Sequence, residues 1–299
     1  MNHDLLDAAL MPSAIVIGVV TGGVLIPSVM TPRHAARVLS VFCVIGALAL
    51  GWVLFLVAAA NVVQIHGIAE RIPLCGDIFG RHRDLPTPLG LGSIALLVAS
   101  TIAATRTRRV QRRLRAGAGA GAHPVEIVPS DRPTAFSLPG RPGQIVVSTA
   151  MLRVLDADEQ GALFAHERAH LEYHHHRYVR VTELCAAAFP LLRPIARRVR
   201  FAVERWADEV AAIAVGDRQL VALALAKAAL VDTTASGALA LSDSGVVERV
   251  EALLSPPRRA SRVAIGLACV GIAMVGGALS VSAVLAHHWL TALLGLCAP

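Results

Sequence analysis

The sequence predicts an integral-membrane protein that is mainly α-helical, with about four transmembrane helices and one cytoplasmic α+β domain. Hydrophobic residues make up 55% of its 299 residues and charged residues only 16%, against about 45–50% and about 25% in typical soluble domains. Four stretches are long and apolar enough to cross a bilayer. Between the third and fourth stretches, the roughly 140 residues from the Ala- and Gly-rich linker to about Ser255 are enough to form one soluble core.

The four apolar stretches are interpreted as transmembrane helices. They cover about residues 13–30, 38–60, 88–105 and 263–286, and a helix needs about 17–25 residues to cross the hydrocarbon core. Asp4 and Asp7 precede the first stretch, so it lacks the basic start of a signal peptide. The spans carry no charged residue near their centres, which disfavours a transporter.

Arginines at the borders of these stretches set the expected orientation. Eleven of them fall on one side: Arg33, Arg37, Arg106, Arg108, Arg109, Arg112, Arg113, Arg115, Arg258, Arg259 and Arg262. Only Arg71, Arg81 and Arg83 fall on the other side. Because cytoplasmic loops carry the excess of Lys and Arg, we expect loops 31–37 and 106–260 in the cytoplasm and both termini outside. The chain is thus expected to be a multi-pass protein of the plasma membrane. Its net charge of +7 is interpreted as membrane-border arginine, and no direct nucleic-acid binding is expected.

The chain is expected to divide into three parts. Residues 1–115 hold the first three transmembrane helices, residues 116–260 form the cytoplasmic domain, and residues 261–299 hold the last helix and a short tail. The domain begins with alternating Ala and Gly at 116–122, a composition typical of a flexible linker.

Turn and cap residues predict the elements of the cytoplasmic domain. Two short strands, 135–138 and 144–148, flank a turn rich in Pro and Gly. Asp156 or Asp158 is expected to cap a helix that runs to about Val179. Further helices are expected at roughly 195–215, 218–231 and 246–254.

Residues 181–192 form an apolar stretch that Pro190 interrupts. Twelve residues are too few to span a bilayer. The stretch is interpreted either as a buried core helix or as a segment that dips into the cytoplasmic leaflet. Several arginines follow it, at Arg193, Arg197, Arg198 and Arg200. Their spacing fits lipid headgroups and a solvated helix face about equally.

The motif His166-Glu167-Arg168-Ala169-His170 carries the chemistry. Residues four apart on a helix project from one face, so His166 and His170 can bind one metal ion. Glu167 lies beside them, where it can accept a proton from water. This HExxH arrangement is typical of zinc-dependent proteases.

A second pair of acidic residues, Glu204 and Asp208, is also spaced four apart on a predicted helix. A catalytic zinc site takes three protein ligands, and Glu204 can supply the third. Asp208, one turn along, can accept a hydrogen bond from a ligand imidazole. His175 is open to two interpretations. It is a fourth ligand or a substrate-binding group, or it is a solvated or hydrogen-bonded histidine.

Residues 135–215 resemble the core of the integral-membrane gluzincin peptidases. The segments 135–140 and 145–149, the HExxH motif with His175, and the pattern Glu204-x-x-Ala207-Asp208 resemble the HtpX and CAAX-prenyl-protease family. The four-span layout looks more like the related BlaR/MecR antirepressor family. Antibiotic-sensing members of that group carry a penicillin-binding domain after the last span. Only about a dozen residues follow Ala286 here, so we do not expect such a domain.

The resemblance implies a zincin-like protease domain that binds one Zn²⁺ per chain through His166, His170 and Glu204. It also implies that Glu167 is the base and that peptide bonds are hydrolysed at the cytoplasmic membrane face. These families mostly have a small or apolar residue where this chain has Arg168.

Two classes of function remain at this stage. The first is a membrane zinc endopeptidase, which acts either in regulation, by cleaving a cytoplasmic repressor, or in HtpX-like quality control. The second is a non-catalytic membrane signalling protein that retains the fold. The expected partners are the lipid bilayer and a protein or peptide substrate, which could add as a strand to the edge of 135–138 or of 145–148.

The five cysteines are widely scattered and form no metal-binding pattern. Cys43, Cys185 and Cys269 are expected to pack as small apolar residues. Cys75 and Cys297 are both expected outside the cell, where disulfides persist. A Cys75–Cys297 bridge and two unpaired thiols are the alternatives.

Overall fold

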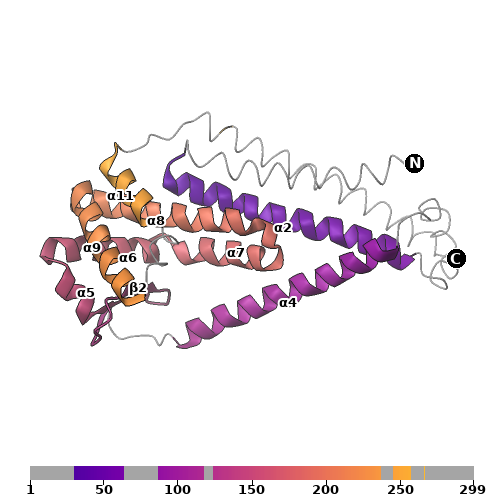
Figure 1. Cartoon of the computed structure of the whole chain (residues 1–299), viewed down its shortest axis with the longest axis horizontal. Coiled ribbons are helices and arrows are strands. Elements are labelled where there is room, and N and C mark those ends of the chain that lie inside the picture. The colour runs from indigo at the N-terminus through magenta and orange to yellow at the C-terminus, as the bar shows by residue number, and fades with distance from the viewer. Residues whose placement is uncertain (1–29, 64–86, 118–123, 237–244, 257–265, 267–299) are drawn as a thin grey trace.

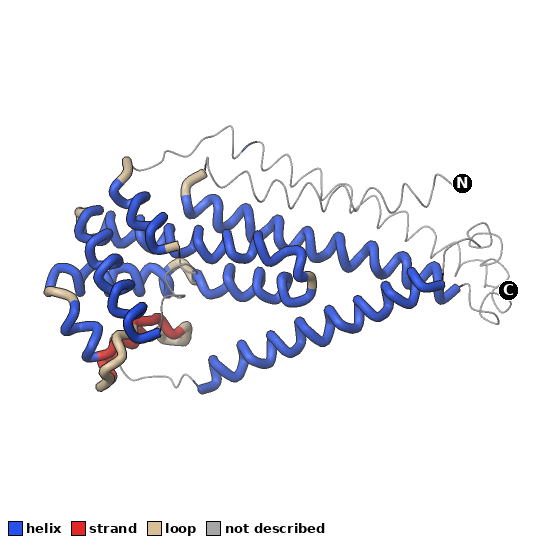
Figure 2. The backbone as a smooth tube through the Cα atoms, in the orientation of Figure 1, coloured by secondary structure: helices blue, strands red, loops and turns tan. Residues whose placement is uncertain are grey.

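The structure is a computed structural model that describes residues 30–63, 87–117, 124–236, 245–256 and 266 (Figure 1). Most of the predicted first and fourth spans lies outside these residues, as do Cys75, Cys269 and Cys297. The described part is mainly helical, with a small sheet beside the helices at one end (Figure 2).

Two long helices correspond to the predicted second and third spans. They are α2 (Pro32–Val63) and α4 (Thr87–Gly117), and both are long and apolar enough to cross a membrane. Only 29% of the most apolar window of α2 and 11% of that of α4 is buried, whereas the core helix of a soluble protein is mostly covered. This exposure suggests association with a membrane.

Helix α4 extends further than the sequence predicts. It continues through Ala116 and Gly117, so the prediction that the linker begins at Ala116 is wrong. The second half of α4 carries five arginines with exposed side chains: Arg106, Arg108, Arg109, Arg112 and Arg113. The remainder of the predicted linker is not among the described residues.

A three-stranded sheet follows, in the order β1 (Val125–Val128), β3 (Gln144–Ser148), β2 (Ala135–Leu138). The antiparallel pairing of β2 with β3 confirms the predicted hairpin. The sequence analysis did not predict β1, which pairs in parallel with β3. Strand β3 is buried throughout, and β2 is an edge strand of this sheet.

The short helix α5 (Thr149–Val154) follows β3 directly and was not predicted. Ser148 caps it, because its hydroxyl accepts a hydrogen bond from the backbone N–H of Met151. Asp156 then caps α6 (Ala157–Glu172) in a capping box with Glu159.

The prediction that this helix runs to Val179 is wrong. His174 adopts a left-handed backbone conformation, with φ of 53°. The chain turns there, and a new helix, α7 (His175–Ala188), begins. Residues 181–192 therefore form the end of α7 and a 3₁₀ turn, η3 (Pro190–Leu192). Thr182 in this stretch is buried and Leu191 is exposed.

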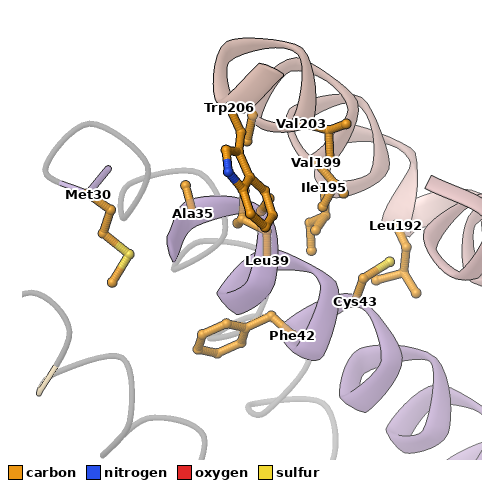
Figure 3. Close-up of a cluster of buried hydrophobic side chains, with 12 residues drawn as sticks. Met30, Ala35, Leu39, Phe42, Cys43, Leu192, Ile195, Val199, Val203 and Trp206 are labelled. Atoms are coloured by element: carbon orange, nitrogen blue, oxygen red, sulfur yellow. The ribbon is translucent and has the colours of Figure 1, made fainter. Parts of the chain in front are cut away.

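Helix α8 (Arg193–Val215) packs along α2. Ile195, Val199, Val203 and Trp206 on α8 bury their side chains against Leu39 and its neighbours on α2 (Figure 3). Helices α9 (Arg218–Ser236) and α11 (Val246–Leu254) complete the domain. The three helices predicted after residue 192 are thus confirmed. The apolar contact between α2 and α8 packs α2 directly against the helix that carries Glu204 and Asp208.

Candidate metal centre

Helices α6 and α8 pack against each other and bring three side chains together. His166 Nε2 lies 3.1 Å from His170 Nε2 and 3.5 Å from Glu204 Oε2, and His170 Nε2 lies 3.7 Å from Glu204 Oε1. A tetrahedral zinc ion with bonds of about 2.0–2.1 Å separates its ligand atoms by about 3.3 Å. The nearest carboxylate oxygen differs for the two rings, but one ligand atom from each of the three residues lies within 4.8 Å of the other two, so the set could hold such an ion.

Asp208 lies behind His166, on the side away from the cluster. Its Oδ1 is 3.1 Å from His166 Nδ1, and the carboxylate is buried. In the neutral form of the ring, the Nδ1 proton is donated to Asp208 and the Nε2 lone pair of His166 faces the other two donor atoms. The structure thus places Asp208 where the i, i+4 spacing from Glu204 suggests.

Arg249 is the member of the site that the sequence analysis missed. Its Nε and Nη2 donate to the two oxygens of Asp208 at 2.8 Å and 2.7 Å, and its Nη1 lies 3.4 Å from Glu204 Oε2. The guanidinium is buried, although it comes from α11, 41 residues after Asp208. One signal was available, because Arg249 lies in the apolar stripe that Val246 and Leu253 form on α11.

His175 lies behind His170. Its Nδ1 is 3.1 Å from His170 Nδ1, on the side of the ring away from Nε2, and its side chain is fully buried. This position matches the hydrogen-bonded interpretation, and His175 is not one of the three residues whose donor atoms converge.

The two carboxylates control the charge of the histidine pair. Burial alone would lower the pKa of His166, but hydrogen bonds to Asp208 and Glu204 raise it to about 10. Burial lowers the pKa of His170 to about 4. Burial opposes ionisation of Glu204, but its hydrogen bond with His166 and the nearby positive charge hold its pKa below the usual range. At neutral pH the site therefore holds a proton on His166.

Glu167 is buried beside this cluster. Burial raises the pKa of its carboxyl above the usual range, and a hydrogen bond with Ser137 on β2 partly opposes this shift. A raised pKa suits a group that must accept a proton and release it again near neutral pH.

Two cavities meet at the cluster. The larger, of about 370 Å³, reaches His166, Glu167 and Glu204 and is lined mostly by apolar side chains, among them several of α6 and α9. The smaller, of about 170 Å³, reaches His170, His175 and Glu204. Strand β2 borders both, because Ala135 and Phe136 line the larger cavity and Ser137 lines the smaller one.

One family model matches the chain, that of peptidase family M48, over residues 102–190. The matched segment contains His166, Glu167 and His170 and ends before Glu204. This match supports a zinc metallopeptidase of family M48. Searches of curated proteins and of solved structures found no match.

Replacing Arg249 by Leu should destabilise the domain at neutral pH. The change leaves the buried carboxylate of Asp208 without its strongest partner, and breaking a buried pair from one side costs about 3–5 kcal/mol. Thermal unfolding of the full-length protein measures this loss. Glu248→Gln, an exposed change on the same helix, should stay within about 0.5 kcal/mol. Equal unfolding midpoints for the two variants would contradict the role of the buried pair.

Proposed function

We propose that this protein is a membrane-bound, zinc-dependent endopeptidase that hydrolyses peptide bonds at the cytoplasmic face of the membrane. The observation that carries the proposal is the convergence of three donor atoms, from His166, His170 and Glu204, next to the buried carboxyl of Glu167. These three residues would hold one Zn²⁺ per chain.

The roles of the surrounding residues follow from their contacts. Zinc, when bound, polarises the scissile carbonyl and acidifies water. Glu167 accepts a proton from the attacking water and returns it to the leaving amine. Asp208 keeps the proton of His166 on Nδ1, and Arg249 holds Asp208 in place. The pair therefore orients one metal-binding ring and offsets its charge.

The substrate is proposed to bind as an extended strand along β2. Strand β3 pairs with a neighbour on each side, whereas β2 pairs only with β3 among the described strands. Of the two strands considered from the sequence, β2 therefore has the backbone groups to pair with a peptide. It also borders both cavities at the cluster.

The position of Glu167 sets the direction of the substrate. Glu167 lines the larger cavity and not the smaller one, and it must protonate the leaving amine. The residue after the scissile bond therefore lies toward the larger cavity. A substrate strand antiparallel to β2 would run from Ser137 toward Ala135. It would therefore pass from the smaller cavity, which Ser137 lines, to the larger cavity, which Ala135 lines. We infer a preference for a bulky apolar side chain directly after the scissile bond.

The biological role is proposed from the resemblance to the BlaR/MecR group. In this proposal the enzyme cleaves a cytoplasmic repressor. Its active site lies in a cytoplasmic domain at 116–260, which transmembrane helices flank on both sides. HtpX-like quality control is the alternative. A non-catalytic signalling protein is the less favoured class, because Glu167 and the donor set are all present and converge.

Glu167→Gln should retain zinc and lose roughly 100- to 10,000-fold in the rate of peptide hydrolysis, because the base is removed and the ligands are kept. Metal analysis and a peptide-cleavage assay measure the two quantities. Glu172→Gln, an exposed change on the same helix, is the matched control. Glu204→Ala should lose stoichiometric zinc. If Glu167→Gln cleaved peptide at the rate of the parent protein, the base would be misassigned. If Glu204→Ala retained stoichiometric zinc, the third ligand would be misassigned.

Zinc binding should be coupled to proton release. His166, with a pKa of about 10, holds a proton in the metal-free site, whereas His170, with a pKa of about 4, does not. The proton competes with zinc below that pKa, so the zinc affinity should rise about tenfold per pH unit between about pH 5 and 9. Calorimetry in buffers of different protonation enthalpy should count about one proton released. A zinc affinity that is flat over this range would contradict the proton on His166.

Ala228→Leu should change the choice of substrate. Ala228 lines the larger cavity, and the added methyl groups would occupy space meant for the side chain after the scissile bond. We expect kcat/KM to fall at least about tenfold for peptides with Phe at that position and much less for peptides with Ala. Ala226→Leu makes the same change on α9 at a residue that does not line the cavity. Equal selectivity of both variants would contradict the assigned direction.

The membrane orientation can be tested with reporters. A reporter that is active only in the cytoplasm should be active when fused after Arg115 and silent when fused after Asp77. The opposite pattern would place proteolysis outside the cell.

A further inference from the structure

A buried histidine, His175, contacts the ring of His170 on the side away from the proposed metal site. His170 Nε2 faces His166 and Glu204, and His170 Nδ1 faces His175 Nδ1 at 3.1 Å. Of two nitrogens in a hydrogen bond, one must donate and the other accept. If Nε2 of His170 binds the metal, the proton of the His170 ring lies on its Nδ1. Nδ1 of His175 must then accept the hydrogen bond from that N–H.

This assignment puts the proton of His175 on its own Nε2. That atom is buried and has no hydrogen-bond partner among the described residues. No second hydrogen bond therefore fixes the ring of His175 in its acceptor orientation. Packing against neighbouring rings has to do so.

Trp206 is the nearest of these rings. Its centroid lies 4.6 Å from that of His175, and Tyr173 stacks on His175 at 6.0 Å. The guanidinium carbons of Arg33 and Arg37 lie 5.6 Å and 5.5 Å from the centroid of the Trp206 ring, within range of a cation–π contact.

These contacts join two distant parts of the chain. Arg33 and Arg37 stand one turn apart at the start of α2, and Trp206 on α8 lies beside that start (Figure 3). A continuous line of contacts thus runs from the first turns of α2 through Trp206 and His175 to His170.

We propose that His175 is a positioning residue for His170, and that Arg33 and Arg37 hold it in place through Trp206. The position of α2, a helix able to cross a membrane, thereby sets the geometry of the metal centre. This inference rests on the proposed metal site and is independent of which peptide is cleaved.

The first test measures metal binding by full-length protein in detergent micelles. Zinc affinity is obtained by competition with a chelator, and the visible spectrum of the cobalt-loaded protein reports the geometry of the ligands. His175→Leu fills the space but accepts no hydrogen bond, and we expect zinc affinity to fall roughly 10–100-fold with an altered cobalt spectrum. His175→Asn places Oδ1 where Nδ1 was, and it should restore most of the affinity.

His174→Asn is the matched control, because His174 is the exposed neighbour and Asn tolerates its left-handed backbone. Parental affinity and an unchanged spectrum in His175→Leu would overturn the positioning role. Failure of the parent protein to bind zinc would instead contradict the proposed metal site.

The second test separates α2 from the site. The double variant Arg33→Ala with Arg37→Ala should shift the cobalt spectrum in the same sense as His175→Leu, with a smaller loss of zinc affinity. The control is Arg193→Ala with Arg197→Ala, two exposed arginines one turn apart on α8. A spectrum and an affinity equal to those of the parent in the first pair would overturn the link to α2.

Discussion

The two nitrogens of His166, each facing a different carboxylate, are the constraint around which the site is built. Asp208 faces Nδ1 and Glu204 faces Nε2, and both carboxylates have pKa values below the usual range although burial opposes this. Two negative charges in a helical interior need compensation. Arg249 supplies one positive charge from α11, and the proton on His166 supplies the other. The packing of α11 on the domain is therefore part of the chemistry of the site.

The same balance sets the charge that a metal ion would meet in the proposed site. With Asp208, Glu204, Arg249 and protonated His166, the charges of the cluster sum to zero. If a dication replaced the proton in the proposed metal site, one net positive charge would remain in the same space. That charge would favour ionisation of Glu167, whose pKa burial otherwise raises. In the proposed enzyme, the buried network that holds the ligands would thus also favour the ionised form of the base.

The sequence predicts those parts of the site that depend on local periodicity. His166 and His170, like Glu204 and Asp208, are spaced one helical turn apart, so their helices bring each pair to one face whatever the tertiary fold. Arg249 depends on the packing of α11 against α8, and only its position in an apolar stripe hints at burial. The break at His174 has no Gly or Pro to mark it. The adjacent rings of Tyr173 and His175 pack on Trp206, a contact between residues about 30 positions apart. Strand β1 has four residues, of which three are exposed, and its pairing with β3 is long-range. Periodicity in one segment carries no information on such contacts.

Helix α2 has two environments along its length, although the sequence predicts a single transmembrane span at about 38–60. Its first turns pack on α8 through Ala35, Leu39 and Cys43, all nearly inaccessible to solvent, as in the core of a soluble domain. Further along, Leu48 and Phe55 are exposed, as expected for a helix that faces lipid. Apolar residues satisfy both environments, so hydropathy cannot separate the two parts, whereas burial does. Helix α2 runs unbroken from Pro32 to Val63. If its exposed part lies in a membrane, as we propose, a tilt of that part would be passed on to the buried turns beside Trp206, because sharp kinks occur at features such as Pro and α2 has no Pro after Pro32.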